Sequence, residues 1–294
     1  MHLTLTKIDF VINYNTLLKM TKSQKTGLKR NTTDKFYTSK EAVNSCFKLI
    51  INYLDISSDD LCIEPSAGDG AWNDSIKANF SNYKFFDIEP PTNSLEIIEQ
   101  DYLGFNLGFN DYKKIHVIGN PPFGRQSCLA IKFIKKSAEF CDSISFILPK
   151  SFKKDSLKKH FPLKFHLECE YDLSDNSFLV NGEKYDVPCV FQIWVKKEVS
   201  RVIPKKLKPK NYKFVKKTDE HDISFRRVGV YAGKIDRNTL DKSTQSHYFI
   251  KFDVELTDRL FDKLSNINYE NKNNTVGARS ISKQELIKEF NMIT

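Results

Sequence analysis

The stretch Val117-Ile118-Gly119-Asn120-Pro121-Pro122-Phe123 decides the fold of this chain, because an apolar run ends abruptly in Asn-Pro-Pro-aromatic. A short apolar run bounded by a turn signal is typical of a buried strand, and two prolines cannot continue a helix or a strand ladder. The stretch therefore predicts a strand that presents Asn120 at its carboxyl edge. Ligands of open α/β sheets bind outside the carboxyl ends of the strands, so Asn120 is a candidate site residue.

A second turn of this kind lies upstream. Leu61-Cys62-Ile63-Glu64-Pro65-Ser66-Ala67-Gly68-Asp69-Gly70 runs from a short apolar strand into a glycine turn and then a predicted helix. Small residues let the backbone come close to a ligand, and a helix N-terminus after the turn favours polar or anionic groups. The turn matches neither the Gly-x-Gly-x-x-Gly nicotinamide pattern nor a phosphate-binding loop that ends in Gly-Lys-Ser/Thr.

Other apolar segments alternate with helical patterns on both sides of these two turns. Further strands are predicted around residues 83–88, 98–103, 143–149, 165–171 and 187–195. Strands that alternate with helices and close with a strand-loop-strand pair predict an α/β fold, in which a mostly parallel, Rossmann-like sheet ends in an antiparallel hairpin. Short strands after residue 223 and two helices predict a small α+β extension at the C-terminus.

Taken together, the two turns resemble motifs of the amino-methyltransferases that depend on S-adenosyl-L-methionine (SAM) and methylate the exocyclic amine of adenine. Asn120-Pro121-Pro122-Phe123 looks like the catalytic motif of that family, and the segment 64–70 is similar to its SAM loop, Glu/Asp-Pro-x-x-Gly-x-Gly. The resemblance covers residues 34–197, with the SAM loop before the catalytic motif. It implies the class I methyltransferase fold and SAM as the cofactor.

The resemblance also implies roles in catalysis. The side-chain oxygen of Asn120 and the carbonyl oxygen of Pro121 would accept hydrogen bonds from the two N–H groups of the target amine, while Pro122 stiffens the turn. Phe123 would stack on the base, and Phe178 would be a second aromatic near it, or else a hydrophobic anchor. An adenine amine is a poor nucleophile because its lone pair is delocalised, so positioning and electrostatics matter more than a general base.

For the cofactor, the resemblance implies that Glu64 faces the methionine part of SAM, with Gly68 and Gly70 beneath it. Asp87 ends the next strand, where an acid holds the ribose hydroxyls in nucleoside-binding folds, and Glu89 is the alternative. The other expected cofactor residues are Pro65, Ser66, Phe36, Tyr37, Thr38 and Asp101. Asp101 would lie against the adenine amine of SAM. For each acid, a solvated strand end is the alternative interpretation.

Composition limits the class of protein. Of the 294 residues, 40% are hydrophobic and 28% charged, which is ordinary for a soluble globular protein. There is no long apolar run and no signal-peptide pattern, so neither a membrane span nor secretion is expected. The six cysteines are widely spaced, without zinc-ligand spacing, so we expect reduced core residues, no metal site and an intracellular, cytoplasmic location, which for a viral protein is the host cytoplasm.

The net charge of +9 is concentrated near the C-terminus, since residues 201–294 hold 20 Lys and Arg against 12 Asp and Glu. A basic region beside a nearly neutral core suits a nucleic-acid substrate, although a solvated lysine-rich face is the alternative. We expect a basic arm (1–33), a catalytic domain (34–197), a basic linker (198–222) and a target-recognition region (223–294). The expected nucleic-acid contacts are Lys205, Lys206, Arg226, Arg227 and Arg279, with Tyr231 as a further candidate.

The predicted function is therefore methyl transfer from SAM to the N6 amine of adenine in nucleic acid, DNA before RNA. A stacked base cannot reach a pocket at a sheet edge, so the target nucleotide would flip out of the duplex. RNA methylation, methylation of a glutamine amide in a translation factor, and a binding module without catalysis are the alternatives. The sequence leaves the oligomeric state open.

Overall fold

The structure, a computed structural model, describes residues 36–180 and 182–294, so the basic arm expected at 1–33 lies outside the described residues. Within them, the main sheet has seven strands, namely β2 (Leu61–Glu64), β3 (Asn82–Asp87), β4 (Ile97–Glu99), β5 (Ile115–Gly119), β6 (Ser143–Pro149), β7 (Phe165–Asp172) and β10 (Cys189–Lys196). Each strand predicted between residues 61 and 195 is confirmed. β4 is shorter than predicted because the chain turns into the 3-10 helix η1 (Tyr102–Gly104).

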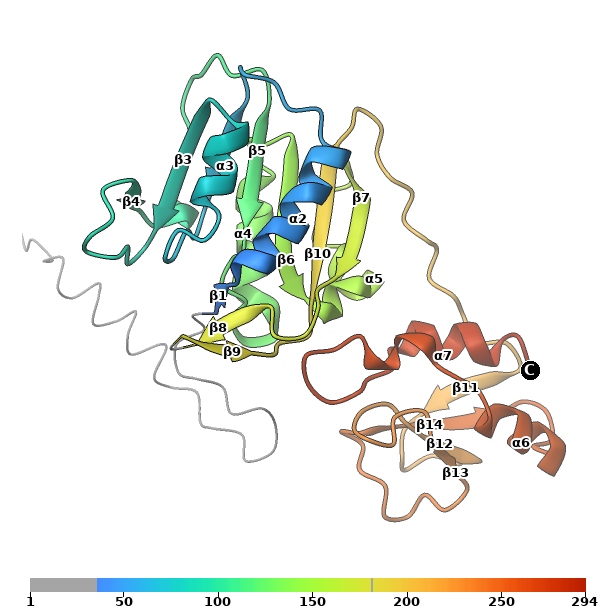
Figure 1. Ribbon diagram of the computed structural model, residues 1–294. Helices are drawn as coiled ribbons and strands as arrows, with labels where there is room; N and C mark the ends of the chain where they lie inside the picture. Colours follow the sequence, from blue (N-terminus) through green and yellow to red (C-terminus); the bar gives the residue numbers. More distant parts are fainter. Residues whose placement is uncertain (1–35, 181) are drawn as a thin grey trace, which may run out of the picture. The chain divides into compact units, whose positions relative to one another are not determined.

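The strands lie in the order β4-β3-β2-β5-β6-β10-β7 (Figure 1). The first five are parallel, while β10 is antiparallel to both β6 and β7. This is the class I methyltransferase fold, with the antiparallel hairpin that the sequence predicted. The chain proceeds outward from β2 to β4 and then returns to place β5 on the other side of β2. The carboxyl ends of β2 and β5 therefore flank the point where the strand order reverses, which is where such sheets bind ligands.

Helices cover both faces of this sheet (Figure 1). The longer ones are α2 (Lys40–Tyr53), α3 (Asn73–Asn79) and α4 (Cys128–Ser137). Shorter helical turns are η2 (Arg125–Ser127), η3 (Lys150–Lys153) and α5 (Asp155–Lys158). Successive residues of β5 point to opposite faces, so Ile118 packs in one core with α2 and α3, and Val117 packs in a second core with α4.

A small antiparallel sheet lies against the first core. It consists of β1 (Tyr37–Thr38), β8 (Phe178–Val180) and β9 (Glu183–Tyr185), in the order β1-β8-β9. Thr38 pairs with Phe178, so a segment at the start of the described chain is joined to one 140 residues later. Ser39 then caps α2 by accepting a hydrogen bond from the backbone N–H of Ala42.

The C-terminal part has a separate core around a four-stranded antiparallel sheet, in the order β11-β14-β12-β13. Its strands are β11 (Tyr212–Val215), β12 (Ile223–Arg226), β13 (Ile235–Asp236) and β14 (His247–Phe252), and its helices are α6 (Asp258–Ser265), η4 (Glu270–Asn273) and α7 (Lys283–Phe290). Ser282 and Glu285 form a capping box at the start of α7. β11 lies within the segment 198–222 that we expected to be a linker, because Tyr212 and Phe214 join this core.

Two further expectations concern the cysteines and membrane-spanning helices. Five of the six cysteines are buried, whereas Cys128 is exposed, and all six are free thiols. Within residues 36–180 and 182–294, no helix is long and apolar enough to cross a membrane.

Candidate active site

The two predicted turns meet at the carboxyl ends of β2 and β5. These strands are parallel neighbours, and the hydroxyl of Ser66 donates a hydrogen bond of 3.1 Å to the carbonyl oxygen of Asn120. Gly119 allows this close approach, since a Cβ atom there would lie only 3.3 Å from Cγ of Glu64 and 3.5 Å from Cδ of Pro65. The structure thus brings the expected SAM loop and the expected catalytic motif into direct contact.

The orientation of the Asn120 side chain is set by two acceptors. Its Nδ2 donates to the carbonyl oxygen of Phe36 at 2.9 Å and to Oγ1 of Thr38 at 3.2 Å. Because the carbonyl oxygen of Phe36 can only accept a hydrogen bond, the amide nitrogen must face it, and the amide oxygen faces away. That oxygen, Oδ1, is buried and has no hydrogen-bond partner within the part of the chain that the structure describes. An unsatisfied buried acceptor is costly, so this atom is suited to receive a donor from a ligand.

The segment Phe36-Tyr37-Thr38 contacts both turns. Beyond its two bonds to Asn120, it places the ring of Tyr37 over the SAM loop, where a Cβ on Gly68 would lie 3.2 Å from the Tyr37 ring carbon Cε1. Pairing of β1 with β8 and a 2.9 Å bond from Ser39 N to Ser177 O hold the segment in place. These three residues therefore border both turns, and their contact with SAM stays a prediction.

The glycine turn after β2 is held by the end of β3. Gly68 adopts a left-handed conformation (φ +56°), and its N–H donates to Oδ2 of Asp87 at 2.8 Å. The other carboxylate oxygen of Asp87 accepts from the N–H of Glu89 at 2.9 Å. Asp87 is therefore fixed beside the loop, with lone pairs remaining on both oxygens for a ligand. Gly70 lies against Asn73, a buried residue that the sequence did not single out.

Glu64 is the most unusual group of the site. Only 1% of it is exposed, and its Oε2 has no hydrogen-bond partner within residues 36–180 and 182–294. Burial raises the pKa of this carboxyl well above its usual value, and repulsion from Asp69 and Asp87 raises it further. A buried carboxylate without a partner is strongly unfavourable, so Glu64 is suited to pair with a cationic ligand group such as an ammonium.

An aromatic cluster borders Asn120. Phe36 stacks on Phe123 with ring centroids 6.4 Å apart and on Tyr185 at 5.8 Å, and it meets Phe178 edge-on at 6.2 Å. Phe123 is 9% exposed, at the border of the site. Phe178 is 0% exposed because β8 turns it into the core, which agrees with the alternative of a hydrophobic anchor, and its stacking on the target base stays a prediction. Tyr185 was not predicted, since nothing in its sequence neighbourhood marks it.

Asp101 has a structural contact at the start of η1. Its side chain accepts a 3.0 Å hydrogen bond from the N–H of Leu103 and so caps η1. Within the described residues its side chain is joined to no other candidate of the site. The expected contact with the adenine amine of SAM therefore stays a prediction.

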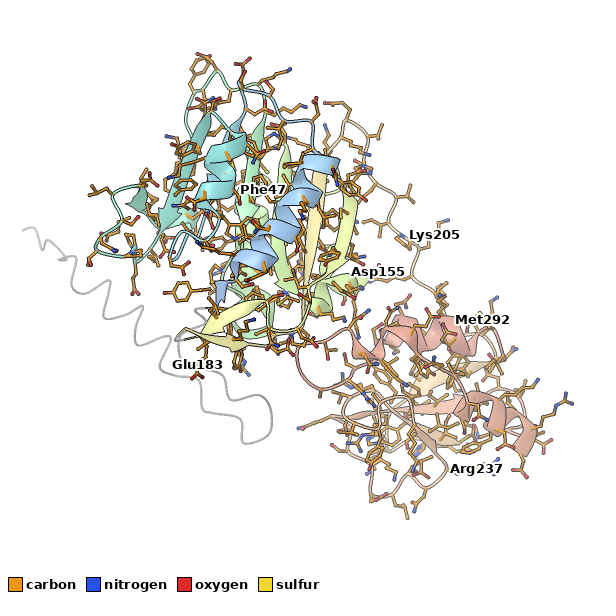
Figure 2. All side chains as sticks on the ribbon, viewed as in Figure 1. Phe47, Asp155, Glu183, Lys205, Arg237 and Met292 are labelled. Carbon is orange, nitrogen blue, oxygen red and sulfur yellow. The ribbon has the colours of Figure 1, made fainter. Side chains whose placement is uncertain are left out.

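The expected nucleic-acid contacts fall into two groups. Lys205 and Lys206 are exposed in the irregular segment before β11, and Figure 2 shows the side chain of Lys205 on it. The end of this segment is bound to α7, where Gln284 holds Leu207 through two hydrogen bonds. Arg226, Arg227 and Arg279 border one turn of the C-terminal sheet, since Arg279 O accepts from Gly229 N at 2.9 Å and Arg279 Nη1 reaches Val230 O at 3.4 Å.

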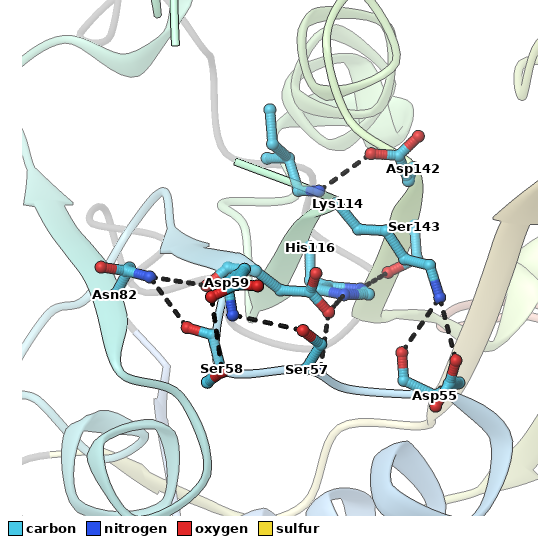
Figure 3. A network of polar contacts seen from close by, with 11 residues as sticks. Asp55, Ser57, Ser58, Asp59, Asn82, Lys114, His116, Asp142 and Ser143 are labelled. Atoms are coloured by element: carbon cyan, nitrogen blue, oxygen red, sulfur yellow. Dashed lines mark hydrogen bonds and ion pairs between the residues drawn. The ribbon is translucent and has the colours of Figure 1, made fainter. Parts of the chain in front are cut away.

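A buried polar network lies at the amino ends of β2, β5 and β6, the opposite edge of the main sheet (Figure 3). His116 Nδ1 lies 2.7 Å from Ser143 Oγ, and its Nε2 lies 3.2 Å from Oδ2 of Asp60. All three residues are buried. The set has the composition of a catalytic triad, but a substrate cannot reach it, so its role is to hold three strands together.

Metal ligation has no support in the described residues. Within 36–180 and 182–294, no group of three or more His, Cys, Asp or Glu side chains could hold a metal ion.

Comparisons with known proteins agree with these observations in part. A family model described as the EDM2 methyltransferase-like domain matches residues 73–201, less than half of the 294-residue chain. The matched region includes Asp87 and Asn120 but begins after the glycine turn. No curated protein has a sequence that matches this chain significantly.

Solved structures with a similar chain path share little sequence with it. A provisionally assigned RNA methyltransferase from Pyrococcus horikoshii has 14% identity and a TM-score of 0.45, over 63% of this chain and 97% of that one. Protein 1320 of Thermoplasma acidophilum has 16% identity and a TM-score of 0.42 (55% and 89%). The 23S rRNA methyltransferase ErmE has 10% identity and a TM-score of 0.42 (58% and 73%). Because these superpositions are loose, the fold is assigned here from its strand order.

Proposed function

We propose that this chain transfers the methyl group of SAM to the N6 amine of adenine in nucleic acid. The observation that carries the proposal is the orientation of Asn120. Its side-chain nitrogen is occupied by Phe36 O and Thr38 Oγ1, and its buried Oδ1 lacks a donor within the described residues. An exocyclic amine of a base supplies N–H donors of the kind that this oxygen lacks.

The residues present fit the proposed cofactor. The carboxylate of Glu64 would pair with the ammonium of the methionine part, which removes an unfavourable buried charge. The left-handed turn at Gly68, which has no side chain, would let the backbone approach the cofactor, and Asp87 would accept hydrogen bonds from the ribose hydroxyls. When bound, SAM supplies an activated methyl group, so the protein needs no strong base.

The chain's own contribution is to hold the amine. Asn120 Oδ1 and the carbonyl oxygen of Pro121 each accept a hydrogen bond from one N–H of the amine. This turns the nitrogen lone pair toward the methyl group. The N–C bond would form as the bond between the methyl group and the sulfonium sulfur breaks, leaving a neutral thioether, and these two oxygens would stabilise the positive charge that develops on the nitrogen. The released proton goes to solvent.

The base must displace side chains before it can bind in this way. Asn120 Oδ1 and Phe123 are both buried, so the base reaches them only when the aromatic side chains around them move. Phe123 then supports the base on one side. In a duplex this requires that the nucleotide flip out.

DNA is the first candidate polymer and single-stranded RNA the second. The excess of basic residues in 201–294, including Lys205 and Lys206, suits phosphate contacts with either one, and residues 212–294 would recognise the target. A glutamine amide also offers a planar NH2 group and is the alternative outside nucleic acids. A binding module without catalysis is the remaining alternative.

The proposal is tested by incubating the full chain with SAM labelled in the methyl group and three acceptors in parallel. These are double-stranded DNA, single-stranded RNA and a protein extract. We expect label in a nucleic acid, and the labelled polymer decides between DNA and RNA. Label in protein alone supports the amide alternative, and label in none of the three contradicts the proposal.

A further inference from the structure

A small cavity in the C-terminal part of the chain has a lining that is mainly cationic and polar. Its volume is about 130 Å³, and it lies among residues of β12, β13 and β14 and the turns between them. Pockets for drug-sized ligands have volumes of about 300–1,000 Å³. This cavity therefore suits a single charged group and is too small for a whole nucleoside.

The positive charges in the lining exceed the negative ones. Arg226, Lys234 and Lys242 line the cavity together with a single acid, Asp236. Lys242 pairs with that acid at 3.0 Å. In the described part of the chain, neither Arg226 nor Lys234 forms an ion pair, and the one side-chain bond of Arg226 is from Nε to the carbonyl oxygen of Val228. Two unpaired cations thus border the same small space.

Local structure brings these two cations together. The chain turns back after β12, so that Arg226 N donates to Lys234 O and Gly233 N donates to Arg226 O, both at 2.8 Å. On the other side, Arg226 is the strand partner of His247 in β14. Nδ1 of His247 donates to Ser243 O at 3.1 Å and lies 3.0 Å from Ser246 Oγ, and Nε2 has no hydrogen bond to any described residue. The turn and the strand pairing fix the cluster without any ligand.

We propose that this cavity binds a phosphate group of the nucleic-acid substrate, with the Arg226 guanidinium and the Lys234 ammonium as its donors. Phosphate oxygens accept charge-assisted hydrogen bonds, for which the planar fork of Arg is especially suited. This inference rests on the proposed function, because it takes the ligand to be a nucleic acid. The phosphate can be a diester of the backbone or a monoester at a chain end, and both have the chemistry that the cavity recognises.

The test measures binding of a short fluorescent single-stranded oligonucleotide, with either a 5′-phosphate or a 5′-hydroxyl, to the full chain by anisotropy. The variants are Arg226→Gln and Lys234→Gln. Lys234 is exposed, so its replacement does not threaten the fold. The matched control is Lys213→Gln, which removes the same charge from β11, the strand at the other edge of this sheet.

We expect each cavity variant to weaken binding about tenfold or more and to lower the salt slope by about one, because one charge-assisted phosphate contact is lost. Lys213→Gln should change affinity by less than about twofold, because Lys213 does not line the cavity and its charge acts on the nucleic acid only through screened attraction. If the wild-type chain prefers the 5′-phosphate and the variants do not, the ligand is the monoester. An equal loss with both oligonucleotides identifies the backbone diester.

Unchanged affinity in Lys234→Gln, or an equal loss in Lys213→Gln, would overturn the proposal, because binding would then depend on diffuse charge only. Inorganic phosphate alone provides a second readout, since it should raise the unfolding temperature of the wild-type chain and not of Lys234→Gln. Failure of the proposed function is distinguishable. A chain that binds through the cavity but transfers no methyl group refutes the activity, whereas one that methylates with unaltered binding in both variants refutes the cavity.

Discussion

The side-chain nitrogen of Asn120 lies 2.9 Å from the carbonyl oxygen of Phe36, a residue 84 positions earlier in the chain. Together with Thr38 Oγ1 at 3.2 Å, this contact holds the Asn120 amide in one orientation and presents its oxygen as an acceptor. A residue at the end of β5 is thus oriented by a strand of the small sheet. The proposed activity therefore depends on the end of β5, which carries Asn120, and on the small sheet that orients it.

Replacement of Asn120 by Ala should abolish methyl transfer while SAM affinity stays within about tenfold of wild type, because this side chain contacts the target and not the cofactor. Transfer is followed with labelled SAM, and SAM binding is measured by calorimetry. Asn79→Ala, in an exposed position of α3, is the matched control. Loss of SAM binding in Asn120→Ala would assign that residue a structural role.

Replacement of Thr38 by Val should lower kcat about two- to tenfold, because the loss of one hydrogen bond costs about 0.5–1.5 kcal/mol and leaves the Asn120 amide less firmly oriented. Thr38→Ser keeps the hydroxyl and should behave as wild type. An effect confined to KM for SAM would contradict an orienting role. Full activity in Thr38→Val would show that Phe36 O alone fixes the amide.

These local contacts explain which site residues could be predicted from the sequence. Asn120, Glu64 and Gly68 stand at strand ends next to turn residues, so the strand and turn patterns locate them without knowledge of the fold. That they share one edge follows from the alternation of strands and helices. The sequence therefore predicted the class I methyltransferase fold, whereas the direct contact between the two turns is a finding of the structure.

Features that depend on long-range pairing could not be predicted in this way. Phe178 reads as an aromatic in a connecting segment, and only its pairing with Thr38 shows that it belongs to the core. Tyr185 reaches Phe36 through the same small sheet. The short strand β11 could not be recognised in the sequence, because the lysines around it obscure the apolar alternation of Tyr212 and Phe214. Lys213 is an exposed residue of this edge strand.

Replacement of Asp87 by Ala should weaken SAM binding by about 1.5–3 kcal/mol, the usual worth of a hydrogen bond to a charged group. The loss also releases the N–H of Gly68, so the loop becomes less ordered. Calorimetric titration with SAM measures the change, and Glu89→Ala tests the alternative acid. If affinity falls only in Glu89→Ala, the ribose contact belongs to that residue.

Replacement of Glu64 by Gln should weaken SAM binding while it stabilises the ligand-free chain at neutral pH. Burial and the repulsion of Asp69 and Asp87 raise the pKa of the Glu64 carboxyl in the folded chain. The contribution of Glu64 to the free energy of unfolding is therefore favourable below a pH of about 4.5, and it is lost as the pH rises toward the pKa of Glu64 in the folded chain. Urea unfolding of both proteins at several pH values measures this. A less stable Glu64→Gln variant at neutral pH would contradict the account.

Replacement of His116 by Leu should destabilise the fold by about 1–3 kcal/mol, since the buried Asp60 carboxylate loses its contact with His116 and keeps only the hydrogen bond from the N–H of Ser57. Burial lowers the pKa of His116 in the folded chain, although Asp60 opposes this. The unfolded chain therefore takes up more protons as the pH falls through about 6.5, and the wild-type chain loses stability there. His160 and His247 also have lowered pKa values, so His116→Leu should reduce this pH dependence and not abolish it. An unaltered dependence would contradict the role of His116.

The most direct test of the central claim is the identity of the methylated nucleoside. Nucleic acid labelled by the wild-type chain is digested to nucleosides and analysed by mass spectrometry, with material treated with Asn120→Ala as the control. We predict N6-methyladenosine, in its deoxy form if DNA is the substrate, and its absence in the control. A methyl group on carbon, on a ring nitrogen or on ribose would contradict the account, because Asn120 Oδ1 would then have no amine to hold.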